Sequence, residues 1–172
     1  VRSSMDERGE ETGRGIPIEI NGGRRMEKAA IYARLSSSGR YDFKDCVETI
    51  RAYGWKHVAN FVDIAQDGYS FDRPEYQRMR RCINDGLVDN VIFPSFLDFT
   101  RDVSSALEEI EYAKERGATF YFCDIDISSD DIDVTSESFK KVLDSLLDES
   151  IHKTFGQNDE VEDELHANKD HI

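Results

Sequence analysis

The sequence predicts an α/β fold of three layers, in which helices cover both faces of a mainly parallel sheet. Four short, largely apolar runs are each followed by a segment whose apolar residues have helical spacing. Such alternation is typical of a parallel sheet, because parallel strands need a long crossover between them. The strand-like runs are 29–33, 57–62, 88–93 and 119–123, and the helical segments are 42–53, 74–85, 104–116 and 136–155.

Boundary residues support the predicted helix limits. Asp72 is available as an N-cap, and Pro74 suits a first turn, where its missing N–H costs nothing. Gly86 and Gly117 stand where glycines commonly follow helices.

The last helical segment has two interpretations. Its apolar residues form one stripe, which is Phe139, Val142, Leu143, Leu146, Leu147, Ile151 and Phe155. The stripe either packs against the core of its own chain or joins two copies in a dimer. The sequence favours neither.

Length and composition predict one domain with polar ends. The 172 residues, of which 38% are hydrophobic, are enough to bury one sizeable core. Residues 1–26 are polar and glycine-rich, with one short strand-like alternation at 16–20, and we expect them to be disordered. Residues 27–155 form the predicted domain, and 156–172 form an acidic, solvated tail.

The net charge of −14 opposes tight binding to nucleic acid. DNA-binding proteins normally present a basic face, because neutralising phosphates supplies much of their affinity. The acidic residues gather at 124–137 and 159–164. One helix nevertheless carries a basic cluster, which consists of Arg73, Arg78, Arg80 and Arg81. A local basic patch can bind a phosphate backbone, so we expect weak DNA binding by the chain alone.

Cysteine and histidine usage argues against metal sites and disulfide frameworks. Cys46, Cys82 and Cys123 are far apart and form no Cys-x-x-Cys pair, which favours reduced thiols in the cytoplasm. The four histidines show no metal-ligand spacing. We predict no metal ion and no other cofactor. No run is long and apolar enough to suggest a membrane span.

The most informative segment is the end of the first apolar run, where Arg34 and Ser36 lie two positions apart. Residues i and i+2 of a strand point to the same side, so the guanidinium and the hydroxyl are expected to emerge together. An arginine can bind a phosphate through two nitrogens while a serine attacks it, and strand ends are common ligand sites in α/β sheets. The alternative is a strand that runs into a polar, serine-rich turn.

Further motifs follow in order. Residues 32–37 read Tyr-Ala-Arg-Leu-Ser-Ser, a Gly-Trp pair at 54–55 precedes the second strand, and residues 67–76 read Asp-Gly-Tyr-Ser-Phe-Asp-Arg-Pro-Glu-Tyr. An Arg-Asp pair at 101–102 then opens a helix. Together these motifs resemble the N-terminal catalytic domain of the serine recombinases, the resolvase/invertase family, over residues 27–155.

The resemblance implies a resolvase-like fold and a serine chemistry. In that family a serine attacks a DNA phosphodiester, forms a 5′-phosphoserine link and frees a 3′-hydroxyl without a metal. Ser36 matches the nucleophile and Arg34 its neighbouring arginine. Arg73 and Arg101 match two further arginines, which stabilise the charge on the phosphate.

Two of these arginines have a surface ion pair as an alternative. Arg73 could pair with Asp72 or Glu75, and Arg101 with one of the aspartates within three residues of it. Taken jointly and in the family's order, the arginines favour an inherited site.

The resemblance also implies partners. The family acts on DNA, so we expect contacts with the phosphate backbone and a homodimer or tetramer. Residues after Gly156 could not make the helix-turn-helix domain that follows in the family. Recognition of a DNA site must then come from a different protein partner or be absent. The expected location is the cytoplasm, in association with DNA.

Residues 96–101 depart from the family, which normally has Leu-Asp-Arg-Leu-Ser-Arg where this chain has Phe-Leu-Asp-Phe-Thr-Arg. Aligned without a gap, Leu97 replaces the aspartate and Asp98 the arginine. Shifted by one residue, Asp98 restores the aspartate, but Phe99 replaces the arginine and Arg101 is displaced. Either way one phosphate-binding arginine is lost, which costs about 10²–10³ in rate in other enzymes.

Two functions from different classes follow. The first is DNA strand cleavage and exchange through Ser36, weakened by the departures. The second is an inactive recombinase-fold module that acts by protein–protein interaction or by regulating DNA recombination. The segment after Ser36 also departs from the family pattern. It carries Arg40, a candidate substitute cation, and Cys46, where the family often has a glutamine. A nucleotide-binding, flavodoxin-like domain is a weaker third interpretation, because no glycine-rich phosphate loop follows the first strand.

Overall fold

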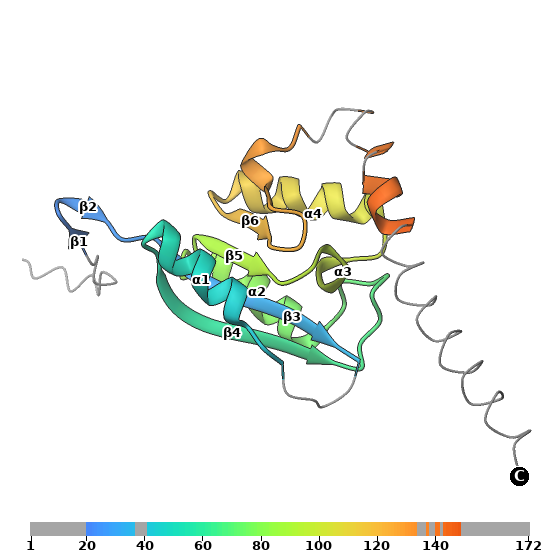
Figure 1. The fold of residues 1–172 in the computed structure, drawn as a ribbon, viewed down its shortest axis with the longest axis horizontal. Helices are drawn as coiled ribbons and strands as arrows, with labels where there is room; N and C mark the ends of the chain where they lie inside the picture. The colour runs from blue at the N-terminus through green and yellow to red at the C-terminus, as the bar shows by residue number, and fades with distance from the viewer. Residues whose placement is uncertain (1–19, 37–40, 134–136, 138–139, 142, 149–172) are drawn as a thin grey trace, which may run out of the picture.

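A computed structural model describes residues 20–36, 41–133, 137, 140, 141 and 143–148. The main sheet contains β3 (Lys28–Leu35), β4 (Lys56–Ile64), β5 (Asn90–Phe93), β6 (Thr119–Phe122) and β7 (Ile127–Ser128), and the α-helices beside it are α1 (Lys44–Tyr53), α2 (Pro74–Asn84), α3 (Phe96–Phe99) and α4 (Val103–Glu115). The strand order is β4-β3-β5-β6-β7 (Figure 1). All pairs are parallel except β6 with β7. The predicted α/β fold with a mainly parallel sheet is confirmed.

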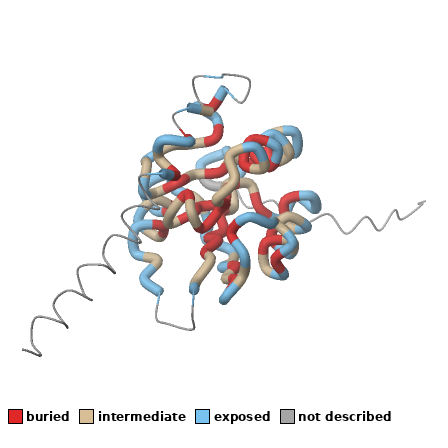
Figure 2. Tube along the Cα trace, turned by 90° about the vertical axis from the view of Figure 1, so that its right-hand side faces the viewer, coloured by how far each residue is buried: buried red, intermediate tan, exposed pale blue. Residues whose placement is uncertain are grey.

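Strand β3, an inner strand of the sheet, contributes alternate residues to both hydrophobic layers. Ala29 and Ile31 pack with Ile50 of α1 on one face. Ala30 and Tyr32 pack on the other face in the larger core, which includes residues of α2 and α4. A strand buried on both faces reads as a continuous apolar run, which is why this strand was visible in the sequence. Figure 2 shows buried segments at the centre of the molecule and exposed ones around it.

Long-range contacts set the start of α2. Its N-cap is Arg73 and not Asp72, so the predicted cap is wrong. The N–H groups of Glu75 and Tyr76 instead donate to the carboxylate of Asp63 in β4, each at 3.0 Å. Because a neighbouring strand already satisfies these donors, the helix needs no acceptor from its own flank.

The predicted glycine positions are confirmed. Gly86 and Gly117 follow α2 and α4 with φ angles of 68° and 72°, a region that glycine adopts without strain. The segment predicted from 42 starts as a helix at Lys44, whose N–H donates to the Asp42 carboxylate at 2.9 Å.

A short hairpin lies where the sequence suggested a disordered extension. It pairs β1 (Ile20–Asn21) with β2 (Arg24–Arg25). The glycines at 22–23 have positive φ angles, which a tight hairpin turn requires. Arg25 binds Asp89 at 2.8 Å and so ties the hairpin to the start of β5. The rest of the predicted extension, residues 1–19, lies outside the described residues.

Three further short elements were not predicted. α3 lies between the predicted strand 88–93 and the predicted helix 104–116, and the Ser95 hydroxyl caps it by accepting from the Leu97 N–H at 3.1 Å. β7 and the 3₁₀ helix η1 (Ser129–Asp131) follow β6. In η1 the Ser129 hydroxyl accepts from the N–H of Phe120, which anchors the turn to β6.

The described part of the C-terminal helix packs on its own chain. Leu143 and Leu147 are buried in the larger core, 0% and 6% exposed. For these residues the packing interpretation is confirmed. Phe139, Val142 and the stripe beyond 148 lie outside the described side chains, as does the predicted tail 156–172. None of the described helices is long and apolar enough to cross a membrane.

Candidate active site

The carboxyl end of β3 delivers Arg34 and Ser36 to one edge of the sheet. Arg34 is the last residue but one of the strand, and Ser36 follows the strand directly. The arginine is half-buried and the serine is exposed. Within the described residues, the Ser36 hydroxyl has no hydrogen-bond partner.

The guanidinium of Arg34 joins two segments that are far apart in the sequence. Its Nη1 donates to the main-chain oxygen of Gln66 at 3.2 Å, and its Nη2 donates to that of Leu97 at 2.9 Å. Gln66 lies between β4 and α2, and Leu97 lies in α3. Arg34 therefore holds both segments at the exit of β3.

Gly68 brings Arg101 beside Arg34. The Arg101 N–H donates to the main-chain oxygen of Gly68 at 2.9 Å. A Cβ atom on Gly68 would lie 3.0 Å from Cδ of Arg101 and 3.0 Å from Nη2 of Arg34. The missing side chain thus allows both arginines to approach the same backbone. Burial lowers the pKa of Arg34, and the positive charges of Arg101 and Arg73 lower it further.

Arg73 is the most deeply buried of the predicted site residues, with 1% of its surface exposed. Its Nη1 donates to the main-chain oxygen of Asp98 at 3.0 Å, and its Nη2 donates to that of Phe99 at 2.5 Å. The guanidinium also lies against three aromatic rings, 4.8 Å from the ring centre of Tyr76. The alternative of a surface ion pair for Arg73 is therefore wrong.

An acid lies next to these arginines. Asp98 is 8% exposed, and its Oδ1 accepts from the Arg34 N–H at 3.3 Å while its Oδ2 accepts from the Tyr41 hydroxyl at 3.4 Å. Burial raises the pKa of Asp98 to about 6, although the hydrogen bond and the charge of Arg34 act in the opposite direction. Above that pH the carboxylate offsets part of the positive charge.

Asp63 is a supporting residue that sequence reasoning missed. Besides capping α2, its Oδ2 accepts from the Tyr32 hydroxyl at 2.8 Å. Burial raises the pKa of Tyr32, so the hydroxyl keeps its proton and donates. Asp63 thus joins β3, β4 and the first turn of α2, the helix that Arg73 precedes. The only signal in the sequence was an acid directly after the second apolar run.

The remaining sequence candidates lie elsewhere or outside the described residues. Cys46 is buried in α1, with its Sγ 3.8 Å from that of Cys123. Arg40 lies outside the described residues. Among the residues that the structure describes, no three or more histidine, cysteine, aspartate or glutamate side chains gather to hold a metal ion.

The structure therefore brings three predicted arginines together around α3, with Ser36 at the adjacent strand end. Arg34 and Arg101 are half-buried and can meet an anion, whereas Arg73 supports the site from the core. Chemically, the arrangement offers two guanidinium groups and a hydroxyl to an oxyanion.

The family model for the resolvase N-terminal domain matches residues 29–154. The chain belongs to the resolvase family. Domains of this family are serine recombinase catalytic domains, so the resemblance seen in the sequence is confirmed. No protein with a curated description matches the chain.

Solved structures show the same resolvase fold. The N-terminal catalytic domain of TP901-1 integrase has a TM-score of 0.55 and 21% identity, over 77% of this chain and 98% of that chain. A resolvase family site-specific recombinase from Streptococcus pneumoniae has a TM-score of 0.53 and 16% identity, over 80% of this chain and 99% of that chain.

Within this resolvase domain, α3 divides its side chains between site and core. Asp98 contacts the Arg34 backbone, while Phe99 is fully buried with its ring 5.1 Å from that of Phe93. Neither residue supplies a cation to the site.

Proposed function

We propose that the chain cleaves and rejoins DNA strands through Ser36. The observation that carries the proposal is the approach of Arg34 and Arg101 over Gly68, at the strand end from which Ser36 emerges. Two guanidinium groups suit a phosphodiester, because each can donate two hydrogen bonds to its oxygens. Membership of the resolvase family supports the same chemistry.

The reaction exchanges one phosphate ester for another. The Ser36 Oγ forms a bond to phosphorus and loses its proton, and the bond from phosphorus to the 3′-oxygen breaks. The 3′-oxygen takes up a proton, and the 5′-phosphate stays on the serine. Because the ester is conserved, attack by a 3′-hydroxyl on the phosphoserine reverses the step and joins strands.

The arginines take different parts in this proposal. Arg34 and Arg101 bind the phosphate and stabilise the charge that grows on it in the transition state. Arg73 acts as a positioning residue, because it is buried and both of its terminal nitrogens hold main-chain oxygens of α3.

A second candidate is an inactive module that acts through protein–protein interaction. The observation that favours it is the use of Arg34: both terminal nitrogens already donate to main-chain oxygens, and Asp98 lies beside them. A phosphate would have to compete with these contacts and with the negative charge.

A covalent adduct between the protein and DNA distinguishes the two candidate functions. Purified protein is incubated with supercoiled plasmid and with nicked duplexes of randomised sequence, so that the target site need not be known. Denaturing gels then reveal protein joined to DNA. An adduct that disappears in Ser36→Ala and persists in the neighbouring Ser37→Ala supports cleavage.

The double variant Leu97→Asp, Asp98→Arg restores the family pattern. If only this variant forms the adduct, the natural chain is a disarmed recombinase and the second candidate holds. If neither protein forms it while an active recombinase does so in the same assay, the cleavage proposal is wrong.

We propose further that the chain contacts the DNA backbone as a homodimer or tetramer, with another protein supplying recognition of the target sequence. Sedimentation of the chain with and without duplex DNA tests the assembly. A monomer under both conditions would contradict it.

A further inference from the structure

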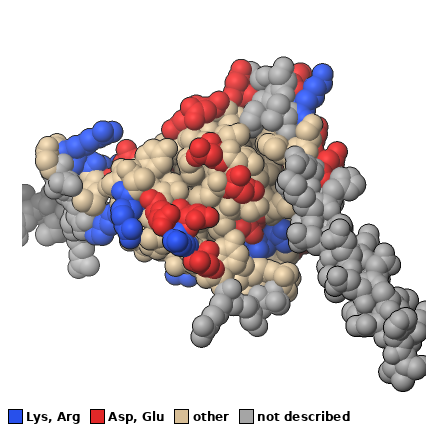
Figure 3. All heavy atoms as spheres, viewed as in Figure 1, with Lys and Arg blue, Asp and Glu red and all other residues tan. Residues whose placement is uncertain are grey.

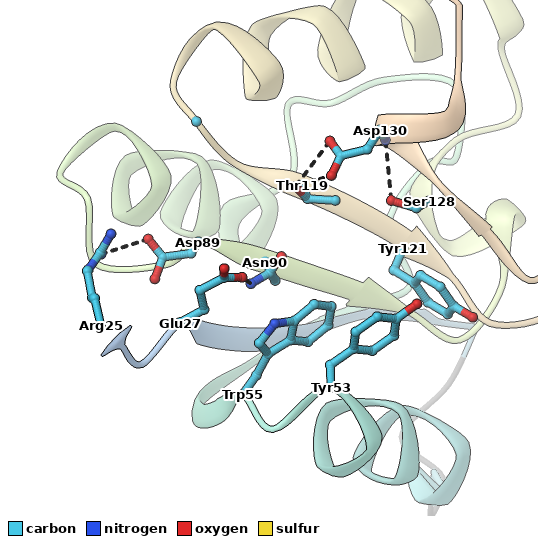
Figure 4. A pocket seen from close by; sticks show the side chains of 11 residues that line it. Arg25, Glu27, Tyr53, Trp55, Asp89, Asn90, Thr119, Tyr121, Ser128 and Asp130 are labelled. Atoms are coloured by element: carbon cyan, nitrogen blue, oxygen red, sulfur yellow. Dashed lines mark hydrogen bonds and ion pairs between the residues drawn. The ribbon is translucent and has the colours of Figure 1, made fainter. Parts of the chain in front are cut away.

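A cavity lies at the opposite end of the sheet from Arg34 and Arg101. It has a volume of about 290 Å³ and opens beside the amino ends of β3, β5 and β6 (Figure 4). Glu27 lines the cavity at the start of β3, and Arg34 lies near the end of that strand. At about 3.3 Å per residue, the two are roughly 23 Å apart. None of the proposed catalytic residues lines the cavity.

One wall of the cavity is aromatic. The rings of Tyr53 and Trp55 are stacked, with their centres 4.3 Å and their planes 7° apart. Tyr121 meets Tyr53 edge-on at 5.9 Å. Tyr53 is 55% exposed, so part of this wall is open to solvent. The faces of such rings attract cations through their negative π density.

The other side of the cavity is acidic. It carries three carboxylates and one guanidinium, those of Glu27, Asp89, Asp130 and Arg25 (Figure 4). The lining has an excess of two negative charges, and the exposed Arg24, which lies outside the lining and 3.9 Å from the Glu27 carboxylate, offsets part of it. Asp89 binds Arg25 at 2.8 Å, which shows how a guanidinium is held here. Asp130 accepts from the Thr119 hydroxyl and has no cationic partner among the described residues.

We propose that this cavity binds an arginine or lysine side chain on a basic segment of a partner protein. An aromatic wall facing carboxylates suits a cation, because ring faces and carboxylates both attract positive charge. The same carboxylates repel phosphates, so a nucleic acid is the wrong occupant. The volume lies at the small end of ligand pockets, which suits one side chain.

The charge of the whole molecule agrees with a basic partner. The chain carries a net charge of −14, and Figure 3 shows acidic side chains spread over one face, with basic ones at and beside the hairpin and at a few other places. A field of this sign steers positively charged segments towards the protein. The cavity would then select among them through its aromatic wall.

The single tryptophan makes the proposal measurable, because Trp55 is the only one in the chain and lies in the wall. The probe is a blocked eight-residue peptide with two arginines and two lysines among glycines and serines. Its titration into the full chain is expected to change the Trp55 emission in a saturable way. A peptide with glutamates in place of the basic residues is expected to leave it unchanged.

Two double variants separate a site from general attraction. Glu27→Gln with Asp130→Asn removes two charges from the cavity, and Glu108→Gln with Glu111→Gln removes two from the exposed side of α4. The first pair is expected to weaken peptide binding at least about tenfold, and the second less than about twofold, at the same ionic strength. Tyr53→Ala is expected to weaken binding without any change of net charge.

Three results would overturn the proposal. Equal losses in both double variants would mean non-specific attraction to an acidic chain. A saturable Trp55 response to duplex or single-stranded DNA, unaffected by the cavity variants, would mean a nucleic-acid site. The same emission change on concentrating the protein alone would mean that a second copy of this chain occupies the cavity. Circular dichroism confirms that each variant is folded.

Discussion

Arg73 donates a hydrogen bond from Nη1 to the main-chain oxygen of Asp98 at 3.0 Å, and this bond joins the start of α2 to α3. A second bond reaches the main-chain oxygen of Phe99. A four-residue helix cannot satisfy its own last carbonyls, so a buried arginine supplies the donors. The arginine that the sequence motif matched to a catalytic position thus makes the contacts of a scaffold in this chain.

Replacing Arg73 should therefore affect stability first. Arg73→Met is expected to lower the free energy of unfolding by about 3 kcal/mol, because two buried carbonyls lose a charged donor. Arg73→Lys keeps the charge but not the planar fork and should cost about half as much. Urea unfolding measures both. A loss below about 0.5 kcal/mol in Arg73→Met would contradict the structural role.

Asp63→Asn tests the junction of β3, β4 and α2. The substitution changes one carboxylate oxygen into an amide NH₂ group. This group cannot accept the hydrogen bonds that the Tyr32 hydroxyl and the Tyr76 N–H donate to Asp63. We expect a loss of about 2 kcal/mol in the free energy of unfolding. Asp67→Asn is the matched control, since Asp67 is exposed and, among the described residues, accepts from the nearby Tyr69 N–H alone. Similar losses in the two variants would refute the special position of Asp63.

Asp98 should make stability depend on pH. Its pKa of about 6 in the folded state exceeds the usual aspartate value of about 3.9, so the folded state binds the extra proton between those values. Ionised Asp98 therefore destabilises the fold above pH 6, and this cost disappears as the pH falls towards 4. The stability of Asp98→Asn relative to wild type should rise by about 2 kcal/mol from pH 4.5 to 7.5. Urea unfolding of both proteins at pH 4.5 and 7.5 measures this difference in stability. A difference that does not change with pH would contradict the raised pKa of Asp98.

Gly68→Ala should disturb the two arginines more than the fold. The added Cβ would lie 3.0 Å from atoms of Arg34 and Arg101, and flexible side chains can move away from it. We expect the rate of adduct formation to fall at least about tenfold, because small displacements at a reacting centre are costly. The free energy of unfolding should change by less than about 1 kcal/mol. An unchanged rate would separate these arginines from the chemistry.

Cys46 and Cys123 should form a disulfide on mild oxidation. Their sulfur atoms are 3.8 Å apart, and hydrogen bonds from Cys46 and then Thr49 lower the pKa of Cys123 in opposition to burial. Hydrogen peroxide takes two electrons and two protons from the pair and becomes water. Mass spectrometry should find the Cys46–Cys123 link and a loss of two hydrogens. Half-buried Cys82 is the internal control, and a link through Cys82 would contradict the expectation.

Elements with long sequence patterns could be predicted. The predicted run 29–33 lies inside β3, and the predicted run 88–93 ends at the last residue of β5. Both could be recognised because a strand buried on both faces is a continuous apolar run in the sequence. α3 was not predicted, because four residues are too few to show a helical period of apolar side chains. Its start was nevertheless encoded by Ser95, a good N-cap residue followed by apolar side chains.

The site was only partly open to sequence reasoning. Arg34 and Ser36 could be paired from strand alternation alone, since they are two residues apart. Arg73 was recognised from a motif, but its burial depends on aromatic rings and carbonyls from distant segments. Asp63 could not be recognised, because its three donors come from β3 and α2 and no local pattern joins them.

The supports of α3 have a consequence for the order of folding. Asp124, just beyond β6, accepts from the Phe96 N–H at 3.1 Å at one end of α3, and Arg73 donates to carbonyls at the other end. So short a helix has no stability alone, because its first turn costs more entropy than one hydrogen bond returns. We therefore expect α3 to form only after both α2 and β6 have docked. A chain in which either of them is not yet in place would lack the edge that gathers the arginines.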